Sequence, residues 1–142
     1  MSLSNIVIPR RTIAIPGSPE PLVVRGLSSF DFSLLLTNRR EDFLAAIGVF
    51  QSNQDNPTEA AIELVRILPT LVALGIALAA DEPEAVGKAA QLPAPIQIQA
   101  LLDIAELTVS DPGALPNLAG RLRNMVAGAA AAARVPTPSL GS

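Results

Sequence analysis

The sequence predicts a mainly α-helical fold that begins with a small β-hairpin, an α+β arrangement with a bundle of about five to six helices. Short β-branched runs broken by proline occupy residues 1–27, and apolar residues recur at helical spacing over 28–134. Of the 142 residues, 49% are hydrophobic but only 3% are aromatic, so aliphatic side chains must form the core. We therefore expect an N-terminal hairpin arm (1–27), a helical domain (28–134) and a flexible Pro/Ser/Gly tail (135–142).

The first 27 residues contain the strand signals. Alternation places Ile13 and Ile15 on one face of a strand over 11–15, and a Pro- and Gly-rich turn separates it from a second strand over 22–26. Residues 5–8 are a candidate third, edge strand. Because an isolated hairpin is only marginally stable in water, it must pack on the helices or on another chain.

Two helices are expected next. Ser28 and Asp31 have the spacing of a capping box at the start of a helix over 29–37, and Asn38 is the expected N-cap of a helix over 39–51. The first of these helices should turn inward Phe30, Leu34 and Leu35, and the second Phe43, Ile47 and Phe50.

Prolines delimit the next pair of helices. Pro57 is suited to the first position of a helix over 57–68, and Pro69 must break or kink that helix. The following residues, 71–78, are apolar all round, which is typical of a helix in the core or against a partner. The uncharged stretch 67–80 is 14 residues long, short of the ~20 that cross a bilayer, so a buried or partner-facing helix is favoured over a membrane anchor.

The remaining helices are predicted over 83–91, 95–109 and 114–134. The helix over 95–109 should bury Ile98, Leu101, Leu102, Ala105 and Val109, with Gln99, Asp103 and Glu106 on its wet face. The pair Asp103 and Glu106 could bind a cation, but a solvated helix face is the preferred interpretation. The helix over 114–134 carries Leu115, Leu118, Leu122, Met125 and Ala129 at helical spacing.

Composition excludes most chemistry. The chain has no His and no Cys, which removes disulfides, thiol nucleophiles, histidine acid–base catalysis and the usual zinc ligands. A net charge of −3 does not favour nucleic-acid binding, and no glycine-rich phosphate loop is present. We therefore expect no catalytic residues, no cofactor and no metal site, and a protein that is not an enzyme.

The remaining feature is a surplus of aliphatic surface. An apolar surface of this kind is typical of proteins that form homo-oligomers or bind another apolar helical chain. The alternative is a compact core that buries all of the aliphatic side chains. The candidate partner-binding residues are Leu71, Leu74, Ile76, Leu78, Leu118, Leu122 and Met125.

Two parts of the chain also carry a resemblance to a known family. The runs 11–17 (RTIAIPG) and 22–28 (LVVRGLS), followed by a helix near Phe30, and the segment from Leu92-Pro93 to LLDIAELT at 101–108 resemble the tail assembly chaperones of long-tailed bacteriophages, which are encoded just before the tape measure protein. The resemblance spans about residues 11–110.

The resemblance implies a function in tail assembly. It implies binding of the long, apolar, coiled-coil tape measure protein, which stays soluble until tail tube subunits displace the chaperone. It also implies a longer frameshifted form, for which the residues from Val135 are a natural junction. No secretory signal is visible at the N-terminus, so the host cytoplasm is the expected location. A structural tail or connector subunit that uses its hairpin for subunit contacts is the alternative function, and a membrane-anchored small protein is a weaker one.

Overall fold

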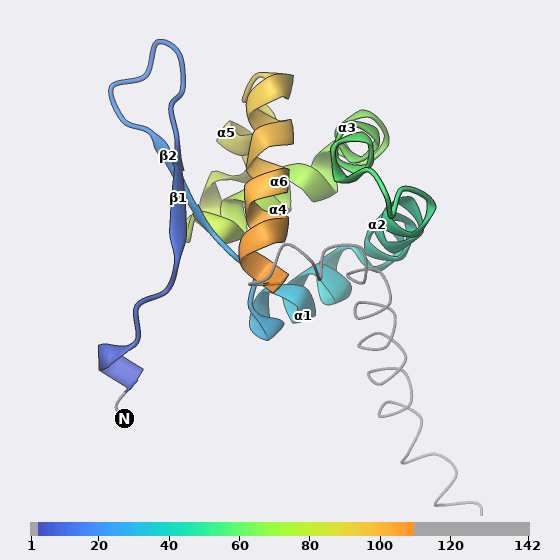
Figure 1. The fold of residues 1–142 in the computed structure, drawn as a ribbon, viewed down its shortest axis with the longest axis horizontal. Coiled ribbons are helices and arrows are strands. Elements are labelled where there is room, and N and C mark those ends of the chain that lie inside the picture. The colour runs from blue at the N-terminus through green and yellow to red at the C-terminus, as the bar shows by residue number, and fades with distance from the viewer. Residues whose placement is uncertain (1–2, 110–142) are drawn as a thin grey trace, which may run out of the picture.

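The computed structural model describes residues 3–109, which form an antiparallel hairpin and six α-helices (Figure 1). The predicted fold class is confirmed. The hairpin pairs β1 (Arg10–Ile13) with β2 (Leu22–Arg25). The helices are α1 (Ser29–Asn38), α2 (Arg40–Ser52), α3 (Pro57–Ile67), α4 (Pro69–Ala79), α5 (Val86–Ala90) and α6 (Ala94–Val109). The helix predicted over 114–134 and the tail 135–142 lie outside the described residues.

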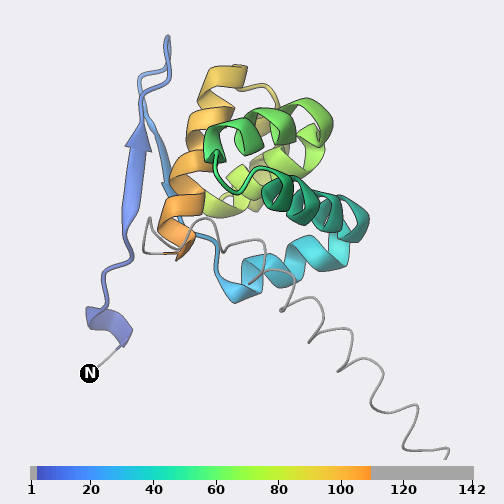
Figure 2. The ribbon, with the colours of Figure 1, turned by 45° about the vertical axis from the view of Figure 1, so that its right-hand side comes forward.

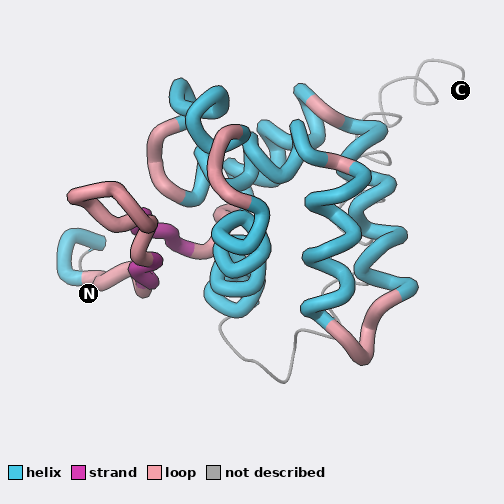
Figure 3. The backbone as a smooth tube through the Cα atoms, turned by 90° about the horizontal axis from the view of Figure 1, so that it is seen from above, coloured by secondary structure: helices cyan, strands magenta, loops and turns pink. Residues whose placement is uncertain are grey.

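The hairpin lies along one side of α6, opposite α2 and α3 (Figure 3). Its inward face buries Ile13 and Val24, which are 7% and 0% exposed. The expected third strand at 5–8 is wrong: Leu3–Asn5 is a single 3-10 turn, and the residues after it run directly into β1 with no turn that would fold them back beside it. The sheet therefore has two strands within the described residues.

The start of α1 confirms the capping box and corrects its inward face. The Asp31 amide donates to Ser28 Oγ (3.2 Å), and the Ser28 amide donates to Asp31 Oδ2 (2.8 Å). Phe30, which we expected inside, is 70% exposed, whereas Phe32 and Leu35 are buried. The reason is that the Asp31 side chain points inward to Arg25, which turns the helix so that the next residue faces the core.

The junction between α1 and α2 differs from the prediction in one cap. Asn38 does not begin α2. Its side-chain amide donates back to the Leu34 carbonyl (2.8 Å) and thereby caps the end of α1. Arg39 stands at the N-cap position of α2 with no side-chain bond to the helix amides. The expected burial of Phe43 and Ile47 is confirmed.

Pro57 and Pro69 act as predicted. Pro57 is the first residue of α3, with Asn56 Oδ1 accepting from the Glu59 amide, and Pro69 ends α3 so sharply that α4 leaves at 113° (Figure 2). The apolar helix α4 then packs on α1, α3, α5, α6 and β2, at the centre of the fold. Within residues 3–109 no single helix is long and apolar enough to cross a bilayer; α3 and α4 meet the length and composition test only as a bent pair.

The prediction for the buried face of α6 is correct only in part: Leu101, Ala105 and Val109 pack against the core, but they are not the most buried residues of the helix. The fully buried residues are Gln97, Ala100, Asp103 and Ile104. The predicted stripe of Ile98, Leu101, Leu102, Ala105 and Val109 is half-buried. The reason is that α6 is covered on two sides, by the hairpin and by α3 and α4, and the hairpin side supplies Arg11 as a partner for Asp103.

Candidate partner-binding groove

An apolar groove of about 90 Å³ separates α1 and α2 from α6, with α4 as its floor. No extensive packing joins α6 directly to α1 or α2, so the two walls are held apart by α3 and α4 (Figure 2). The groove is partly open to solvent. Lining residues include Phe32 and Leu35 of α1, Phe50 of α2, Leu71 and Gly75 of α4, and Leu101 and Ile104 of α6.

A smaller depression of about 20 Å³ continues the groove toward the loop between α2 and α3. The two hollows share Phe50, Leu64, Leu101 and Ala105. The smaller hollow has two polar residues in its described lining, Asn53 and Gln54, and the Asn53 side-chain amide donates to the Val49 carbonyl (2.9 Å) and to Glu63 Oε2 (3.2 Å). The groove therefore runs from an apolar centre to a polar end.

The described part of the chain presents no free hydrogen-bonding side chain to the main groove. Thr108 is the only polar residue that residues 3–109 contribute to its lining, and its hydroxyl donates to the Ile104 carbonyl (2.6 Å) while it accepts from the Leu27 amide (2.9 Å). Water in such a hollow would lack the polar partners that hold it. The groove is therefore suited to an uncharged, apolar side chain.

Gly75 leaves the floor of the groove open. It lies inside α4, where glycine costs roughly 0.5–1 kcal/mol relative to alanine. A Cβ placed on Gly75 would meet no atom of the other described residues within 4 Å, the backbone of α4 itself apart. The missing side chain therefore leaves space at a position that alanine would make more helical.

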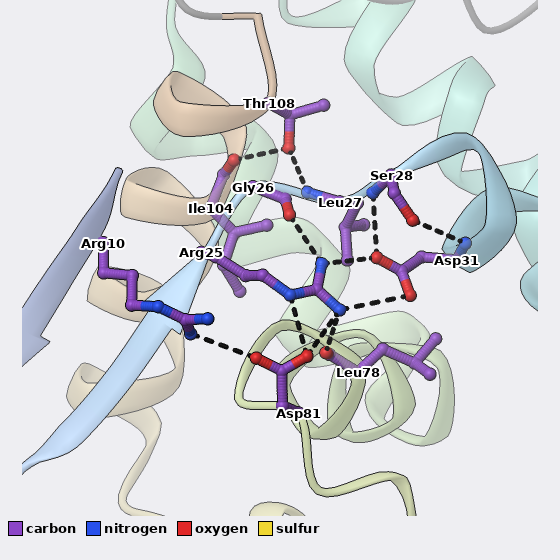
Figure 4. A network of polar contacts seen from close by, with 10 residues as sticks. All are labelled: Arg10, Arg25, Gly26, Leu27, Ser28, Asp31, Leu78, Asp81, Ile104 and Thr108. Atoms are coloured by element: carbon purple, nitrogen blue, oxygen red, sulfur yellow. Dashed lines mark hydrogen bonds and ion pairs between the residues drawn. The ribbon is translucent and has the colours of Figure 1, made fainter. Parts of the chain in front are cut away.

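Arg25 joins the hairpin to the helices that form the groove (Figure 4). Its side chain is 15% exposed, and the guanidinium Nη1 lies 2.6 Å from Asp31 Oδ2, at the start of α1. It also donates to the Leu78 carbonyl near the end of α4 (3.1 Å) and to the Gly26 carbonyl (2.8 Å). One half-buried cation thus links β2, α1 and α4.

Asp81 adds a second anchor for the hairpin. Arg10 and Arg25 stand opposite each other on the two strands, a placement that repels like charges. The Asp81 carboxylate lies between them, 3.0 Å from Arg10 Nη1 and 2.8 Å from Arg25 Nη2 (Figure 4). Asp81 has a left-handed φ of 60°, which a non-glycine residue adopts at a cost. Its amide donates to the Leu78 carbonyl (3.0 Å) in the turn that ends α4, so this backbone shape places the carboxylate.

Arg11 ties β1 to α6. Its Nη1 lies 3.1 Å from Asp103 Oδ1 and 2.8 Å from Glu106 Oε2, and these bonds raise the pKa of Arg11. The pair Asp103 and Glu106, considered above as a cation site, is therefore used by a residue of the same chain. In the part of the chain that the structure describes, no group of three or more metal-ligating side chains occurs.

The link between β2 and α1 touches the backbone of α6. A Cβ on Gly26 would lie 2.7 Å from the Leu107 carbonyl carbon and from the Thr108 amide nitrogen. The next residue, Leu27, donates its amide to Thr108 Oγ1 and lines the groove. The position of the α6 wall relative to the start of α1 is set by this close approach.

The structure places the predicted partner-binding residues as follows. Leu71, Ile76 and Leu78 are buried, 7%, 1% and 4% exposed, and Leu74 is half-buried. Leu71 alone of these four lines the groove. Leu118, Leu122 and Met125 lie outside the described residues. Sequence reasoning placed Phe50 and Leu101 on apolar stripes but did not assign them to a binding surface, because a groove between helices depends on tertiary packing.

The network predicts a loss of stability in acid. Burial alone would raise the pKa of Asp31, but its bonds to Arg25 and Ser28 lower it below the ordinary value, and Arg25 also lowers the pKa of Asp81. A carboxylate whose folded pKa is depressed stabilises the fold above its unfolded pKa and loses that contribution as pH falls. We expect the free energy of unfolding to decrease below about pH 4, measured by urea denaturation at several pH values. A flat profile from pH 6 to 2.5 would contradict this.

A family model described as Pre-tape measure protein matches residues 1–139. Comparison with curated proteins and with solved structures gives no match.

Proposed function

The chain belongs to the pre-tape measure protein family, a family of phage tail assembly proteins, and on that premise we propose that it binds the tape measure protein and keeps it soluble during tail assembly. The proposed role needs no catalytic residue and no cofactor. Tail assembly would take place in the host cytoplasm. A long partner would carry several copies of the chain, which is the form of oligomerisation that we propose.

The apolar groove is the observation that supports this proposal. Its walls come from α1, α2 and α6, and among residues 3–109 no charged side chain lines it. Amphipathic helices commonly bind by inserting apolar side chains into grooves of this kind. A lining without polar anchors selects for apolar character rather than for one sequence, which suits a chaperone that must bind many positions along a repetitive helical partner. Leu118, Leu122 and Met125 remain proposed as an additional binding surface.

Co-expression with the product of the adjacent downstream gene, the tape measure protein, tests the proposal. The unchanged chain should raise the soluble fraction of that product. Leu101→Lys places a charge in the half-buried wall of the groove, and burying an uncompensated charge should weaken binding by about tenfold or more.

Leu44→Lys is the matched control, because Leu44 is 41% exposed on α2 and does not line the groove. This variant should solubilise the tape measure protein as well as the unchanged chain does. Circular dichroism should show that both variants fold. Equal activity of Leu101→Lys and Leu44→Lys would remove the groove from the binding surface. Failure of the unchanged chain would refute the proposed function.

One observation favours a structural virion subunit as the second candidate. The segment before β1 exposes apolar side chains, with Leu3 at 85% and Val7 at 86%, next to a hairpin whose outer strand has an unpaired edge. Such an edge can add to a neighbouring subunit's sheet. Purified mature virions distinguish the two functions: a structural subunit stays in the particle, whereas a chaperone is absent from it.

A further inference from the structure

We infer that the groove receives one large apolar side chain at a time from a helix of the tape measure protein, and that Gly75 sets the depth to which this side chain enters. The inference rests on the proposed function and adds a residue that determines which side chains fit.

The size of the groove supports a single inserted side chain. Its volume is about 90 Å³, and it is partly open to solvent. An apolar cavity of roughly 150 Å³ stays dry and takes up benzene, so a hollow of the present size is suited to one branched aliphatic or aromatic group. Its walls are fixed by the Arg25 network and by the contact of Gly26 with α6, so the site exists before a partner arrives.

Gly75 is the position at which this depth can be changed. The chain offers a close comparison in Gly48, which also lies inside a helix and also has open space where a Cβ would be. Gly75 lines the groove, whereas Gly48 does not. A side chain added at Gly75 would therefore occupy the space that an incoming group needs, and the same addition at Gly48 would leave that space unchanged.

A long apolar helix fits this groove better than a second copy of the chain does. A stable protein pair buries about 800 Å² on each partner, far more than a hollow for one side chain supplies. A tape measure helix with apolar residues at i, i+3, i+4 and i+7 would instead offer many such groups in a row, and weak sites on several bound copies would add along its length. The lining that the described residues form is uncharged, which matches an apolar rather than an acidic or basic helix.

The experiment compares Gly75→Leu with Gly48→Leu for binding to the tape measure protein. We expect Gly75→Leu to weaken co-purification about tenfold or more, since its side chain fills the groove. Gly75→Ala should give a smaller loss, and Gly48→Leu none. Thermal denaturation should show a midpoint for Gly75→Ala that is equal to or above that of the unchanged chain, because alanine favours the helix. If Gly75→Leu fails to fold, Gly75→Ala decides: binding equal to that of the unchanged chain overturns the inference.

Other results would also overturn the inference, and each of them would show which part of it is wrong. If both leucine variants bind normally while the unchanged chain solubilises the tape measure protein, the proposed function stands and the groove is not the site. If Gly75→Leu changes only the oligomeric state in size-exclusion chromatography, a second copy occupies the groove. If it makes residues 110–142 newly sensitive to protease, the groove holds this chain's own C-terminal residues. If the unchanged chain binds nothing, the proposed function itself fails.

Discussion

Replacing Arg25 with alanine should lower the free energy of unfolding by about 3–5 kcal/mol, because it leaves a buried carboxylate without its counter-ion. Asp31 is 3% exposed and lies 2.6 Å from the guanidinium. The same change removes the donor to the Leu78 carbonyl and one of the two cations at Asp81. Urea denaturation at pH 7 measures the loss.

Arg10→Ala is the control for the loss of a charge from the hairpin. The Arg10 side chain is 42% exposed, and its pairing with Asp81 is of the surface type, which contributes about 0–1 kcal/mol. If the two variants are equally stable, Arg25 is not the centre of the network. A loss of less than about 1 kcal/mol for Arg25→Ala would lead to the same conclusion.

The pH dependence of the free energy of unfolding of Arg25→Ala gives a second test. In the unchanged chain the bonds from Arg25 help to hold the pKa of Asp31 below its ordinary value. Without Arg25, burial is opposed only by the bonds to Ser28, so the pKa of Asp31 should rise from its value in the unchanged chain. The unchanged chain loses the stabilising contribution of the Arg25–Asp31 pair as Asp31 is protonated, and the variant has no such pair to lose, so the difference in stability between the two proteins should narrow toward pH 3. A constant difference would show that the loss comes from packing rather than from charge.

Local signals in the sequence were sufficient for most helix boundaries. Pro57 and Pro69 act through their own rings and missing N–H groups, so the start of α3 and the bend before α4 did not depend on the rest of the fold. The capping box of Ser28 and Asp31 is likewise local. The apolar character of residues 71–78 predicted a buried helix or a partner surface, and the structure places α4 in the core.

Predictions failed where a partner from a distant part of the chain decides the outcome. Periodicity places Asp103 on a wet face because it cannot include Arg11, which is 92 residues away in sequence. Periodicity predicts Phe30 inside because it cannot include Arg25, which draws the neighbouring Asp31 into the interior. The groove depends on the angle between α3 and α4 and on how these two helices separate α6 from α1 and α2. The sequence of a single helix does not show this arrangement. The sequence therefore predicts apolar faces for the helices that line the groove, but it does not predict that these faces form a binding site.

The segments that carry the family resemblance gain a physical explanation from their contacts. Within Arg25-Gly26-Leu27-Ser28, the first residue holds the polar network, the second approaches α6, the third lines the groove and the fourth caps α1. The other segment ends in Leu107-Thr108, which is the part of α6 that Gly26 and Leu27 touch. Two distant stretches of sequence thus meet at the edge of the groove, and their contact sets its width.

Gly26→Ala should therefore lower the free energy of unfolding by about 3 kcal/mol, at the upper end of the usual cost of overpacking. The added Cβ would lie 2.7 Å from two backbone atoms of α6, which cannot rotate away as a side chain can. The backbone of Gly26 does not have a positive φ, so the expected loss is steric rather than conformational. Urea denaturation measures the stability.

Gly17→Ala is the matched control for Gly26→Ala, because its added methyl group meets nothing within 4 Å but its φ of 80° strains a non-glycine residue. Gly17→Ala should lower the free energy of unfolding by about 1–2 kcal/mol through backbone strain alone and leave the groove unchanged. Hydrogen exchange at the Leu27 amide separates the two variants, since that amide donates to Thr108 Oγ1. Faster exchange in Gly26→Ala but not in Gly17→Ala would show that the α6 wall has moved, and equal exchange in both would show that Gly26 does not set its position.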